Sequence, residues 1–327
     1  MPLTKGAARK IAIITVNYRA AGDTIECLES IEKTGQEPYI VVVDNNSQDG
    51  SFERFREWAA EHPRMKGEVE FREISATPTP LSRRVTFIES ATNGGFASGN
   101  NIGLRQAAAT PGVDLLWLLN NDTTVDEKAV EAICSYFVRE PDIGMAGTQL
   151  RLYHEPDRFQ LLNGMTFSKV TGAARGVHAG SLVHSPLEAN KVIGQTDFVC
   201  GASLIMSRNF FEAVGYLEER FFLYYEEVDL AYRGRKFPFG YVEDAVVYHK
   251  EGASAGSASQ LSQRARSPLS EYHHIRSKMI FARKHIPWAI PLYFAQNIII
   301  WLRRLARRQG PQARAVLNAI LGRSLDG

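Results

Sequence analysis

The 327-residue chain lacks the features that mark several large classes of protein. It has only three cysteines, Cys27, Cys134 and Cys200, and their odd number and wide spacing favour reduced thiols in the cytoplasm over a disulfide framework. The formal net charge of +2 is too small to favour nucleic acid as a partner. The N-terminal segment runs into a short strand-like stretch and does not resemble a signal peptide. The chain also has no internal repeat, which argues against a solenoid.

Long hydrophobic runs are missing as well. The longest mostly apolar run, Ile286 to Leu302, has 17 residues, two of them proline, whereas a membrane-spanning helix needs ~20 apolar residues. Four arginines follow directly, between Arg303 and Arg308. An apolar run with tryptophan and tyrosine beside an arginine cluster predicts a helix over 286–308 that lies on an anionic membrane surface. The alternatives are that this segment packs on the rest of the chain or forms a homodimer contact.

The first 140 residues alternate between two hydrophobic periods. Strand-like runs are separated by segments in which apolar residues recur at helical spacing. The strand-like runs are Ile11–Val16, Tyr39–Asp44, Arg84–Ser90 and Asp114–Leu119. The helical segments are Asp23–Lys33, Ser51–Glu61 with Ser51 as its cap, Phe96–Ala109 and Asp126–Glu140. Repeated strand–helix units predict a mainly parallel sheet covered by helices, and such sheets bind ligands at the carboxyl ends of their strands.

The pattern is less regular after Pro141. Glycine and small residues in Asn163–Gly180 predict loops and short strands, and Thr196–Arg208 predicts a strand that enters a turn or helix. The small, polar segment Glu251–Ser270 predicts a loop or linker, with a basic, apolar, helical tail beyond it. We therefore expect one domain over 1–255 and a C-terminal extension over 256–327.

Polar side chains stand where two of the predicted strands end. Asp44 closes one strand, and Asn120, Asn121 and Asp122 follow another. Carboxylate and amide oxygens are the ligands that Mg²⁺ and Mn²⁺ prefer, so the second cluster predicts a metal-binding carboxylate at the edge of the sheet. The alternative is an ordinary polar turn that caps the next helix.

A glycine-rich stretch, Asn93 to Gly103, lies between a predicted strand and a predicted helix. It is not a P-loop, because Asn100 stands where that motif requires lysine, and it is not G-x-G-x-x-G. A close approach of its backbone to a ligand, beside a helix N-terminus, is one interpretation. A tight packing turn is the other.

An acidic cluster lies among aromatic residues between Arg220 and Arg235. Helical spacing predicts that Glu226 and Asp229 share a face and that Glu227 points elsewhere. A carboxylate flanked by apolar residues is partly desolvated, which raises its pKa and suits a general base. The alternative is a solvated acidic face that pairs with arginines.

One histidine, His249, ends a further strand-like run. A structural role is the ordinary interpretation of a lone histidine. A divalent ion at Asp122 has coordination positions left over, however, and an imidazole can fill one of them.

Taken in order, these segments resemble the family-two inverting glycosyltransferases, especially the bacterial rhamnosyltransferase-like branch. The resemblance runs from about Ile11 to Gly256. It rests on "IITVNYRAAGDTIECLESI", "VVVDNNSQDGS", "TNGGFASGNNIGL", "LLNNDT", "CGASLIMSRNFFEAVGYLEERFFLYYEEVDLAYR" and "VVYHKEGAS". It implies an α/β protein of the GT-A fold, a mainly parallel mixed sheet flanked by helices. It also implies a nucleotide-diphospho-sugar donor and Mg²⁺ or Mn²⁺ as cofactor.

The resemblance assigns roles to individual residues. For the nucleotide it implies that Thr15 and Asn17 lie beside it, that Asp44 binds the base, and that Asn93, Gly95 and Asn101 line the pocket. Asn120 would lie near the ribose, with Asn121 beside it, and Arg233 would contact the diphosphate. Asp122 and His249 would bind the metal. The family's Glu-Asp pair falls on Glu226 and Glu227, and its second member is the catalytic base. Glu227 therefore takes that role, with Asp229 as the fallback, because glutamate replaces the family's aspartate here.

The implied reaction is a single displacement that inverts the anomeric carbon. The sugar, with rhamnose as the first guess, passes to a hydroxyl of a glycan or lipid-linked acceptor in bacterial polysaccharide biosynthesis, on the inner face of the membrane. Two other functions stay open at this point. One is a nucleotidyltransferase-like enzyme, and the other is a non-catalytic protein that binds sugar nucleotides.

Overall fold

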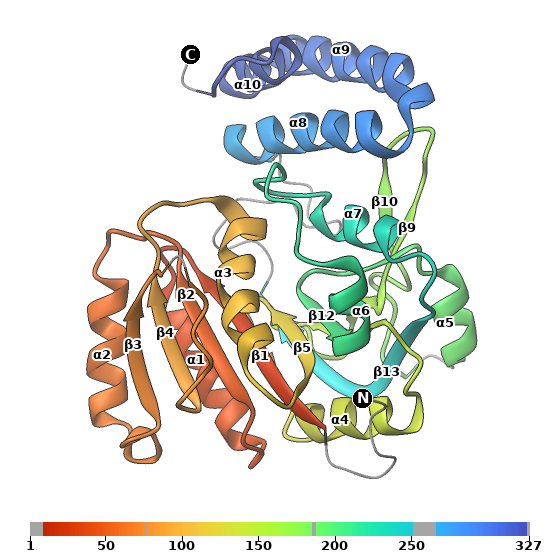
Figure 1. The fold of residues 1–327 in the computed structure, drawn as a ribbon. Helices are drawn as coiled ribbons and strands as arrows, with labels where there is room; N and C mark the ends of the chain where they lie inside the picture. Colours follow the sequence, from red (N-terminus) through yellow and green to blue (C-terminus); the bar gives the residue numbers. More distant parts are fainter. Residues whose placement is uncertain (1–8, 76, 185–187, 251–265, 326–327) are drawn as a thin grey trace.

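The computed structural model describes residues 9–75, 77–184, 188–250 and 266–325 (Figure 1). Its centre is a ten-stranded sheet in the order β3-β4-β2-β1-β5-β12-β7-β13-β6, with β8 paired to β7, and a small sheet β10-β9-β11 stands beside it. The strands are β1 Lys10–Asn17, β2 Tyr39–Asp44, β3 Val69–Glu73, β4 Val85–Glu89, β5 Val113–Leu119, β6 Thr123–Val125, β7 Met145–Leu152, β8 Phe159–Leu162, β9 Gly164–Phe167, β10 Ala174–Gly176, β11 Phe198–Val199, β12 Ser203–Ser207 and β13 Phe239–His249.

Helices cover both faces of this sheet. They are α1 Ala21–Lys33, α2 Ser51–Glu61, α3 Gly95–Ala109, α4 Ala129–Arg139, α5 Ala189–Gln195, α6 Arg208–Val214, α7 Glu226–Arg233, α8 Pro268–His285, α9 Ile290–Ala306 and α10 Gly310–Leu321, with short 3₁₀ turns η1 Pro63–Met65 and η2 Pro287–Ala289. Most of the predicted linker, 251–265, lies outside the described residues.

The sheet is mixed and mainly parallel in its first half, as the strand–helix alternation predicts. Strand β1 pairs in parallel with β2 and β5, and β4 pairs in parallel with β2 and β3, whereas β12 and β6 run antiparallel to their neighbours. The predicted strand and helix at Tyr39–Asp44 and Ser51–Glu61 have the observed bounds.

Three local expectations were wrong. Ser51 does not cap α2, because Gly50, in a left-handed conformation, occupies the N-cap and the Ser51 hydroxyl bonds Asp49 instead. Helix α4 begins at Ala129, later than expected, because Asp126–Lys128 form a turn in which the Asp126 side chain accepts from the Lys128 N–H and the Asp126 carbonyl accepts from the Ala129 N–H. The edge strand β3 was missed, since its charged, half-buried residues do not form an apolar run.

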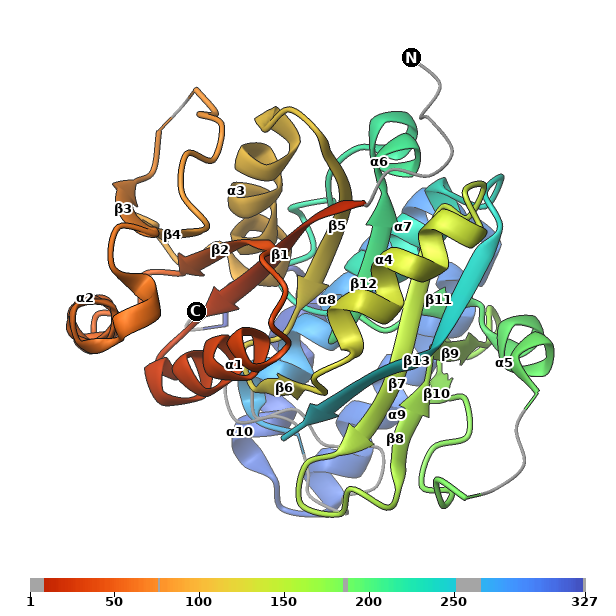
Figure 2. The same ribbon diagram turned by 90° about the horizontal axis from the view of Figure 1, so that it is seen from below.

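The alternation of side chains along each strand divides the core into two layers. Helices α1, α2 and α4 lie on one face of the sheet, and α3, α6, α7 and α8 lie on the other (Figure 2). In β1, Ile11 and Ile13 belong to the core layer with α1, α2 and α4, whereas Ala12 and Ile14 belong to the layer with α3, α6, α7 and α8. The same alternation decides on which face of the sheet each side chain at the end of a strand lies.

The C-terminal helices α8, α9 and α10 stack in a layer of their own (Figure 1). Phe281 and Ile286 join the core that contains α7, while Val316 of α10 packs with Tyr272 of α8. Helix α9 buries Tyr293 on its inner side. Among the described residues, no helix has the length and apolar character needed to cross a membrane.

Candidate active site

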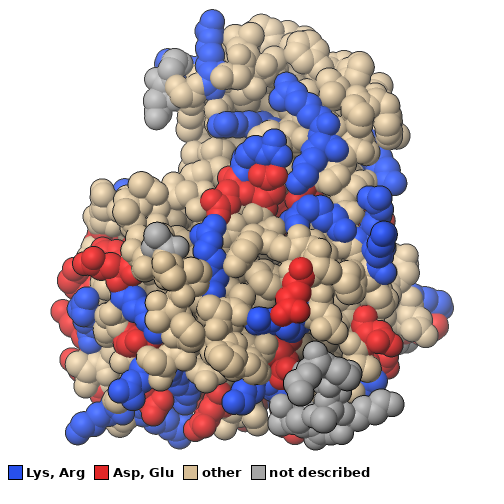
Figure 3. Space-filling view, in the orientation of Figure 1, with Lys and Arg blue, Asp and Glu red and all other residues tan. Residues whose placement is uncertain are grey.

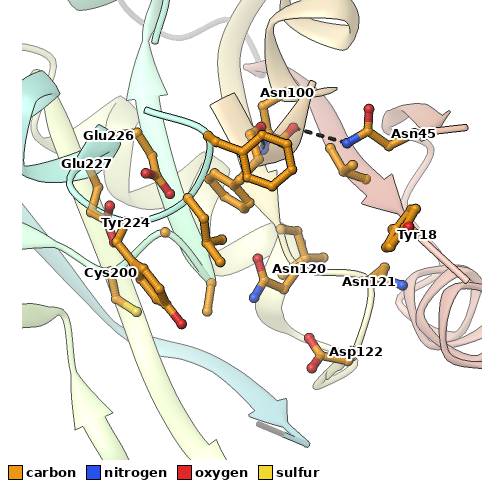
Figure 4. Close-up of a pocket in the computed structure, with 18 of the residues that line it drawn as sticks. Tyr18, Asn45, Asn100, Asn120, Asn121, Asp122, Cys200, Tyr224, Glu226 and Glu227 are labelled. Atoms are coloured by element: carbon orange, nitrogen blue, oxygen red, sulfur yellow. Dashed lines mark hydrogen bonds between the residues drawn. The ribbon is translucent and has the colours of Figure 1, made fainter. Parts of the chain in front are cut away.

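A cleft of about 270 Å³ opens where β1, β2 and β5 end and where α3 and α7 begin (Figure 4). Tyr18 and Asn45 lie on one side, Asn120 and Asp122 in the middle, and Cys200, Tyr224, Glu226 and Glu227 on the other side (Figure 4). The lining also includes Val16, Asn93, Gly95, Phe96, Asn100, Leu119, Asn121, Gly201, Ala202, Phe222, Leu223, His249 and Leu269. The cleft therefore joins segments from most of the length of the chain.

The structure brings about half of the predicted site residues together. Those that line the cleft are Asn93, Gly95, Asn120, Asn121, Asp122, Glu226, Glu227 and His249. Those that do not are Thr15, Asn17, Asp44, Asn101, Asp229 and Arg233. The cleft is also lined by residues that the sequence did not predict as site residues, namely Tyr18, Asn45, Asn100 and Phe222 to Tyr224.

The alternation of side chains along β1 explains why Thr15 and Asn17 do not line the cleft. Thr15 and Asn17 lie on the α1 face of β1, so their neighbours Val16 and Tyr18 face the cleft. The Asn17 amide donates to Asp44 Oδ1 over 2.6 Å and to Ser47 Oγ over 3.1 Å, and both Asn17 and Asp44 are buried. Asn17 and Asp44 thus hold the β1 and β2 ends in place from behind the cleft.

Asn45 takes the pocket-facing position that Asp44 was expected to hold. Its side-chain amide donates to Asn93 Oδ1 over 2.9 Å and to the Gly95 carbonyl over 3.1 Å. The strand alternation of β2 carries the signal that could have found it, because the residue after Asp44 must turn to the opposite face.

The glycine-rich stretch makes the close backbone approach that its composition suggests. Gly95 has φ of +81°, and a Cβ there would lie 2.1 Å from the Phe222 carbonyl oxygen. The Phe96 N–H donates to that same oxygen over 2.8 Å. Asn100 faces the cleft, whereas Asn101 turns away and bonds the backbone of Leu217. Only glycine fits at position 95, where the start of α3 meets the segment before α7.

Asp122 and His249 meet at the centre of the cleft. Asp122 Oδ1 lies 3.1 Å from His249 Nε2, and His249 Nδ1 lies 2.8 Å from Gln160 Oε1. Because the Gln160 oxygen can only accept, it binds a protonated Nδ1 and fixes the ring with Nε2 turned to the carboxylate. Burial opposes ionisation of Asp122, yet His249 and Lys250 hold the pKa of this carboxyl below its usual range.

A carboxylate oxygen and an imidazole nitrogen that face each other are atoms of the kinds that a divalent cation binds. Ligand atoms on one edge of a six-coordinate Mg²⁺ shell lie about 3 Å apart, close to the separation of Asp122 Oδ1 and His249 Nε2. Among the described residues, no group of three or more His, Cys, Asp and Glu side chains could hold a metal ion. The pair therefore fits a divalent ion that takes its other ligands from phosphate oxygens and water.

Glu226 and Glu227 lie across the cleft from Asp122 (Figure 4). Atom Oε2 of each is buried, and neither has a hydrogen-bond partner among the described residues. Burial raises the pKa of Glu227 to about 7. Burial, and then the neighbouring charge of Glu227, raise the pKa of Glu226 well above its usual range. At neutral pH the pair therefore favours one negative charge and one proton.

Asp229 lies on the same helix in a different environment. It is fully buried, and its carboxylate meets Arg233 Nε at 2.7 Å, Lys284 Nζ at 2.8 Å and His285 Nε2 at 2.7 Å. The expectation that Glu226 and Asp229 share a face while Glu227 points elsewhere was wrong. Both glutamates line the cleft, and Asp229 turns towards α8, where its cationic partners lie.

The α8 partners and burial have opposite effects on Asp229. Burial opposes ionisation, but Lys284, His285 and Arg233 together hold the pKa of Asp229 below its usual range. The guanidinium of Arg233 also donates to the carbonyls of Val214 and Tyr216. Neither Asp229 nor Arg233 is thus free to contact a molecule in the cleft.

The turn that precedes α7 is strained and is held by α8. Tyr224 and Tyr225 have φ of 68° and 73°, which costs on the order of 1–3 kcal/mol for each residue. Ser277 donates its hydroxyl to the Leu223 carbonyl over 2.9 Å, and the Tyr224 hydroxyl lies 2.7 Å from Ser270 Oγ. Helix α8 therefore stabilises the conformation in which Glu226 and Glu227 reach the cleft.

Comparisons with known proteins agree with this geometry. A family model described as "Glycosyl transferase family 2" matches residues 11–215. The chain is 24% identical over 233 residues to the low-salt glycan biosynthesis hexosyltransferase Agl10 of Haloferax volcanii, which covers 69% of this chain and 62% of that protein. The chain thus spans less than two thirds of the length of this relative.

Solved structures show the same fold at low sequence identity. The mannosyltransferase PcManGT from Pyrobaculum calidifontis, in complex with GDP-Man and Mn²⁺, matches with a TM-score of 0.52 and 14% identity, over 97% of this chain and 87% of its own. GalNAc-T7 with UDP, GalNAc and Mn²⁺ matches with a TM-score of 0.56 and 12% identity, over 83% of this chain and 48% of its own. The expected GT-A fold is confirmed.

Proposed function

This chain belongs to glycosyl transferase family 2, and from that premise we propose that it transfers a sugar from a nucleotide-diphospho-sugar to an acceptor hydroxyl with inversion. One observation carries the proposal. Two neighbouring carboxyl groups, Glu226 and Glu227, line the same cleft as the Asp122–His249 pair, and each has a buried Oε2 without a hydrogen-bond partner among the described residues. Such an arrangement suits a base on one side and a charged leaving group on the other.

The donor would occupy the side of the cleft formed by β1, β2 and α3. Tyr18 offers an aromatic face on which a base can stack, and Asn45, Asn93 and Asn121 offer amides for the base and ribose. Asn17, Asp44 and Asn101 would act from behind, by holding the backbone that carries these side chains. The expected direct contacts of Asp44 with the base and of Arg233 with the diphosphate stay predictions, and neither residue lines the cleft.

Asp122 and His249 would hold Mg²⁺ or Mn²⁺ beside the diphosphate. A bound divalent ion would neutralise charge that develops on the departing nucleoside diphosphate. Gln160 fixes the ring orientation of His249, so that Nε2 points to the carboxylate. The depressed pKa of Asp122 keeps this carboxylate ionised at neutral pH.

Glu227 would act as the general base. In its ionised form it takes the proton of the acceptor hydroxyl as that oxygen bonds to the anomeric carbon, and the bond to the diphosphate oxygen breaks on the opposite face. Glu226, which retains its proton more strongly, limits the charge of the pair to one. A single displacement of this kind inverts the anomeric configuration.

The sugar and the acceptor are finer proposals. Rhamnose remains our first candidate from the rhamnosyltransferase-like motifs, and the hexosyltransferase and mannosyltransferase likenesses add hexoses to the donors worth testing. A hydroxyl of a glycan or of a lipid-linked glycan is the proposed acceptor. Membership of a glycosyltransferase family disfavours both a nucleotidyltransferase and a non-catalytic binding protein.

A donor screen tests the proposal directly. Thermal unfolding is followed with a panel of nucleotide-diphospho-sugars, each with and without Mg²⁺ or Mn²⁺. A donor at a hundredfold excess over its dissociation constant should stabilise the fold by ~2.7 kcal/mol. Turnover should release nucleoside diphosphate; release of pyrophosphate would show a nucleotidyltransferase, and no binding of any donor would overturn the proposal.

Asp122→Ala is the matching variant. It should fold normally and lose the metal-dependent part of donor affinity, because it removes the carboxylate beside His249. Asp142→Ala, which removes an exposed carboxylate outside the cleft, is the control and should bind like the wild type. Isothermal calorimetry compares the three proteins, and unchanged metal-dependent affinity in Asp122→Ala would contradict the assignment.

A further inference from the structure

Exposed apolar side chains are concentrated on one helix. Of thirteen exposed large apolar residues among the described residues, six lie between Trp288 and Leu305, and each exposes 44–56% of its surface. They are Trp288, Leu292, Phe294, Ile299, Leu302 and Leu305. Scattered exposed apolar residues are ordinary, but a contiguous set marks an interaction surface.

The set is contiguous because of its spacing along α9. Leu292, Ile299 and Leu302 recur at helical spacing, with Ala295 and Ala306 exposed between and beyond them. Tyr293 and Asn297, on the opposite side of the helix, are buried against the rest of the protein. We define the α9 outer face as Leu292, Ala295, Ile299, Leu302 and Ala306, a strip with no charged side chain.

The charge around the α9 outer face is strongly of one sign. Residues 266–327 contain eleven Lys and Arg and two Asp and Glu, a formal charge of +9, whereas residues 1–265 have a formal charge of −7. Figure 3 shows basic side chains over the C-terminal helices. Arg303, Arg307 and Arg308 are exposed, and none has an ion-pair partner among the described residues.

We propose that the α9 outer face and its flanking arginines dock the protein in the plane of an anionic lipid bilayer. The apolar strip would enter the boundary between headgroups and acyl chains, and the arginines would contact lipid phosphates at its margin. Trp288, at the start of this layer, is of a residue type that favours that boundary. The 17 residues of α9 lie along the surface rather than across the bilayer.

Two features favour lipid over a protein partner. Between Pro291 and Leu302 the exposed side of α9 offers almost no hydrogen-bonding group, because Gln296 already donates to the Val170 carbonyl. A protein interface ordinarily contains about one hydrogen bond per 100–200 Å². The formal charge of +9 on residues 266–327 also attracts an anionic lipid surface, and a contact between two copies is one outcome of the test below.

Docking through α9 would have a consequence for the cleft. Leu269, at the start of α8, lines the cleft, and α8 packs directly beneath α9. Packed helices lie about 8–10 Å apart, so the bilayer would lie close to the acceptor side. A lipid-anchored acceptor then fits best, an extension that rests on the proposed transferase function, whereas the docking itself does not.

Vesicle co-sedimentation tests the docking without any sugar donor. The full chain is mixed with phosphatidylcholine vesicles and with vesicles that also contain phosphatidylglycerol, at low and at high salt. We expect pelleting with the anionic vesicles, reduced by high salt. Absence of pelleting with anionic vesicles at low salt would overturn the proposal, while donor binding and turnover in solution would still support the proposed function.

Two double variants locate the surface. Ile299→Glu with Leu302→Glu should abolish pelleting, and Arg303→Gln with Arg307→Gln should weaken it by about fivefold per arginine and reduce its salt dependence. The controls alter exposed residues of the same types elsewhere: Ile74→Glu with Leu182→Glu, and Arg54→Gln with Arg64→Gln. Circular dichroism checks that each variant is folded.

The oligomeric state separates the remaining outcomes. We expect the same light-scattering mass for the wild type and the Ile299→Glu, Leu302→Glu variant. A wild-type dimer that dissociates in this variant would show that the α9 outer face joins two copies, and would overturn the lipid assignment. Pelleting that survives the α9 variants but not the controls would overturn it too.

Discussion

Helix α7 holds three carboxylates in two opposite environments. Asp229 meets Arg233, Lys284 and His285, so its burial is compensated and its pKa is low. Glu226 is buried and Glu227 half-buried, each has a buried Oε2 without a hydrogen-bond partner among the described residues, and the pKa values of both are raised. An uncompensated buried carboxylate costs stability, so its presence in a cleft indicates chemistry, whereas a fully paired one indicates architecture.

Both environments depend on α8, which lies beyond the residues that the family model matches. Its C-terminal end supplies Lys284 and His285 to Asp229, and its N-terminal half supplies Ser270 and Ser277 to the strained turn. The expected boundary between a domain over 1–255 and an extension over 256–327 stays a prediction. These contacts nevertheless make the stability of α7 depend on α8.

The largest expected effect is on turnover. Glu227→Gln keeps the size of the side chain and removes its basicity, so turnover should fall by ~10²–10⁴ with nearly unchanged donor affinity. In the wild type, the rate should rise with pH through about 7, where Glu227 becomes ionised. Steady-state kinetics across pH measure both effects. If Glu227→Gln stays active and Asp229→Asn is folded but inactive, the base is Asp229.

The next largest effect is on the free energy of unfolding, through Asp229. Asp229→Asn leaves Arg233 and Lys284 without their buried partner and should lower the free energy of unfolding by about 3–5 kcal/mol. Because the pKa of Asp229 is lowered, this stabilisation is present above the unfolded pKa and is lost as the pH falls through the folded value. Urea unfolding at neutral and at acid pH measures it.

A surface ion pair is the control for Asp229. Glu212→Gln breaks the exposed pair with Arg208 and should change the free energy of unfolding by less than about 1 kcal/mol. An equally small effect of Asp229→Asn would show that the buried cluster does not stabilise α7.

A smaller effect, of opposite sign, should appear at Glu227. Its folded pKa of about 7 lies above the usual 4.5, so its contribution to stability is full at low pH and is lost as the pH rises through about 7. Glu227→Gln should therefore raise the free energy of unfolding by about 1–3 kcal/mol at pH 8 and leave it nearly unchanged at pH 4. Loss of stability at both pH values would show that Glu227 is a structural residue.

The smallest effect concerns the strained turn. Ser277→Ala removes the donor to the carbonyl of the half-buried Leu223 and should cost about 1 kcal/mol of stability. If this contact also positions Glu227, turnover should fall while the KM for the donor stays constant. Ser168→Ala, away from the cleft, is the control; equal kinetics in both variants would limit Ser277 to a structural role.

Local sequence patterns determined the elements and much of the donor side. Hydrophobic periodicity predicted β1, β2, β5 and most of α1 to α4, because residues within one element select strand or helix by short-range burial. The Asn120–Asp122 cluster was placed correctly for the same reason, since it directly follows a strand whose carboxyl end must lie at the sheet edge. The ordered motifs predicted the GT-A fold.

Tertiary structure alone decided which carboxylate is free and which is paired. The spacing along α7 predicted that Asp229 shares a face with Glu226, but Asp229 turns inward, and this orientation depends on Lys284 and His285, some 56 residues later in the chain. Likewise, strand parity turned Asn45 rather than Asp44 to the cleft, a choice set by which face of the sheet α1 and α3 cover. Such choices rest on partners that are distant in sequence, and only the packed chain brings them into contact.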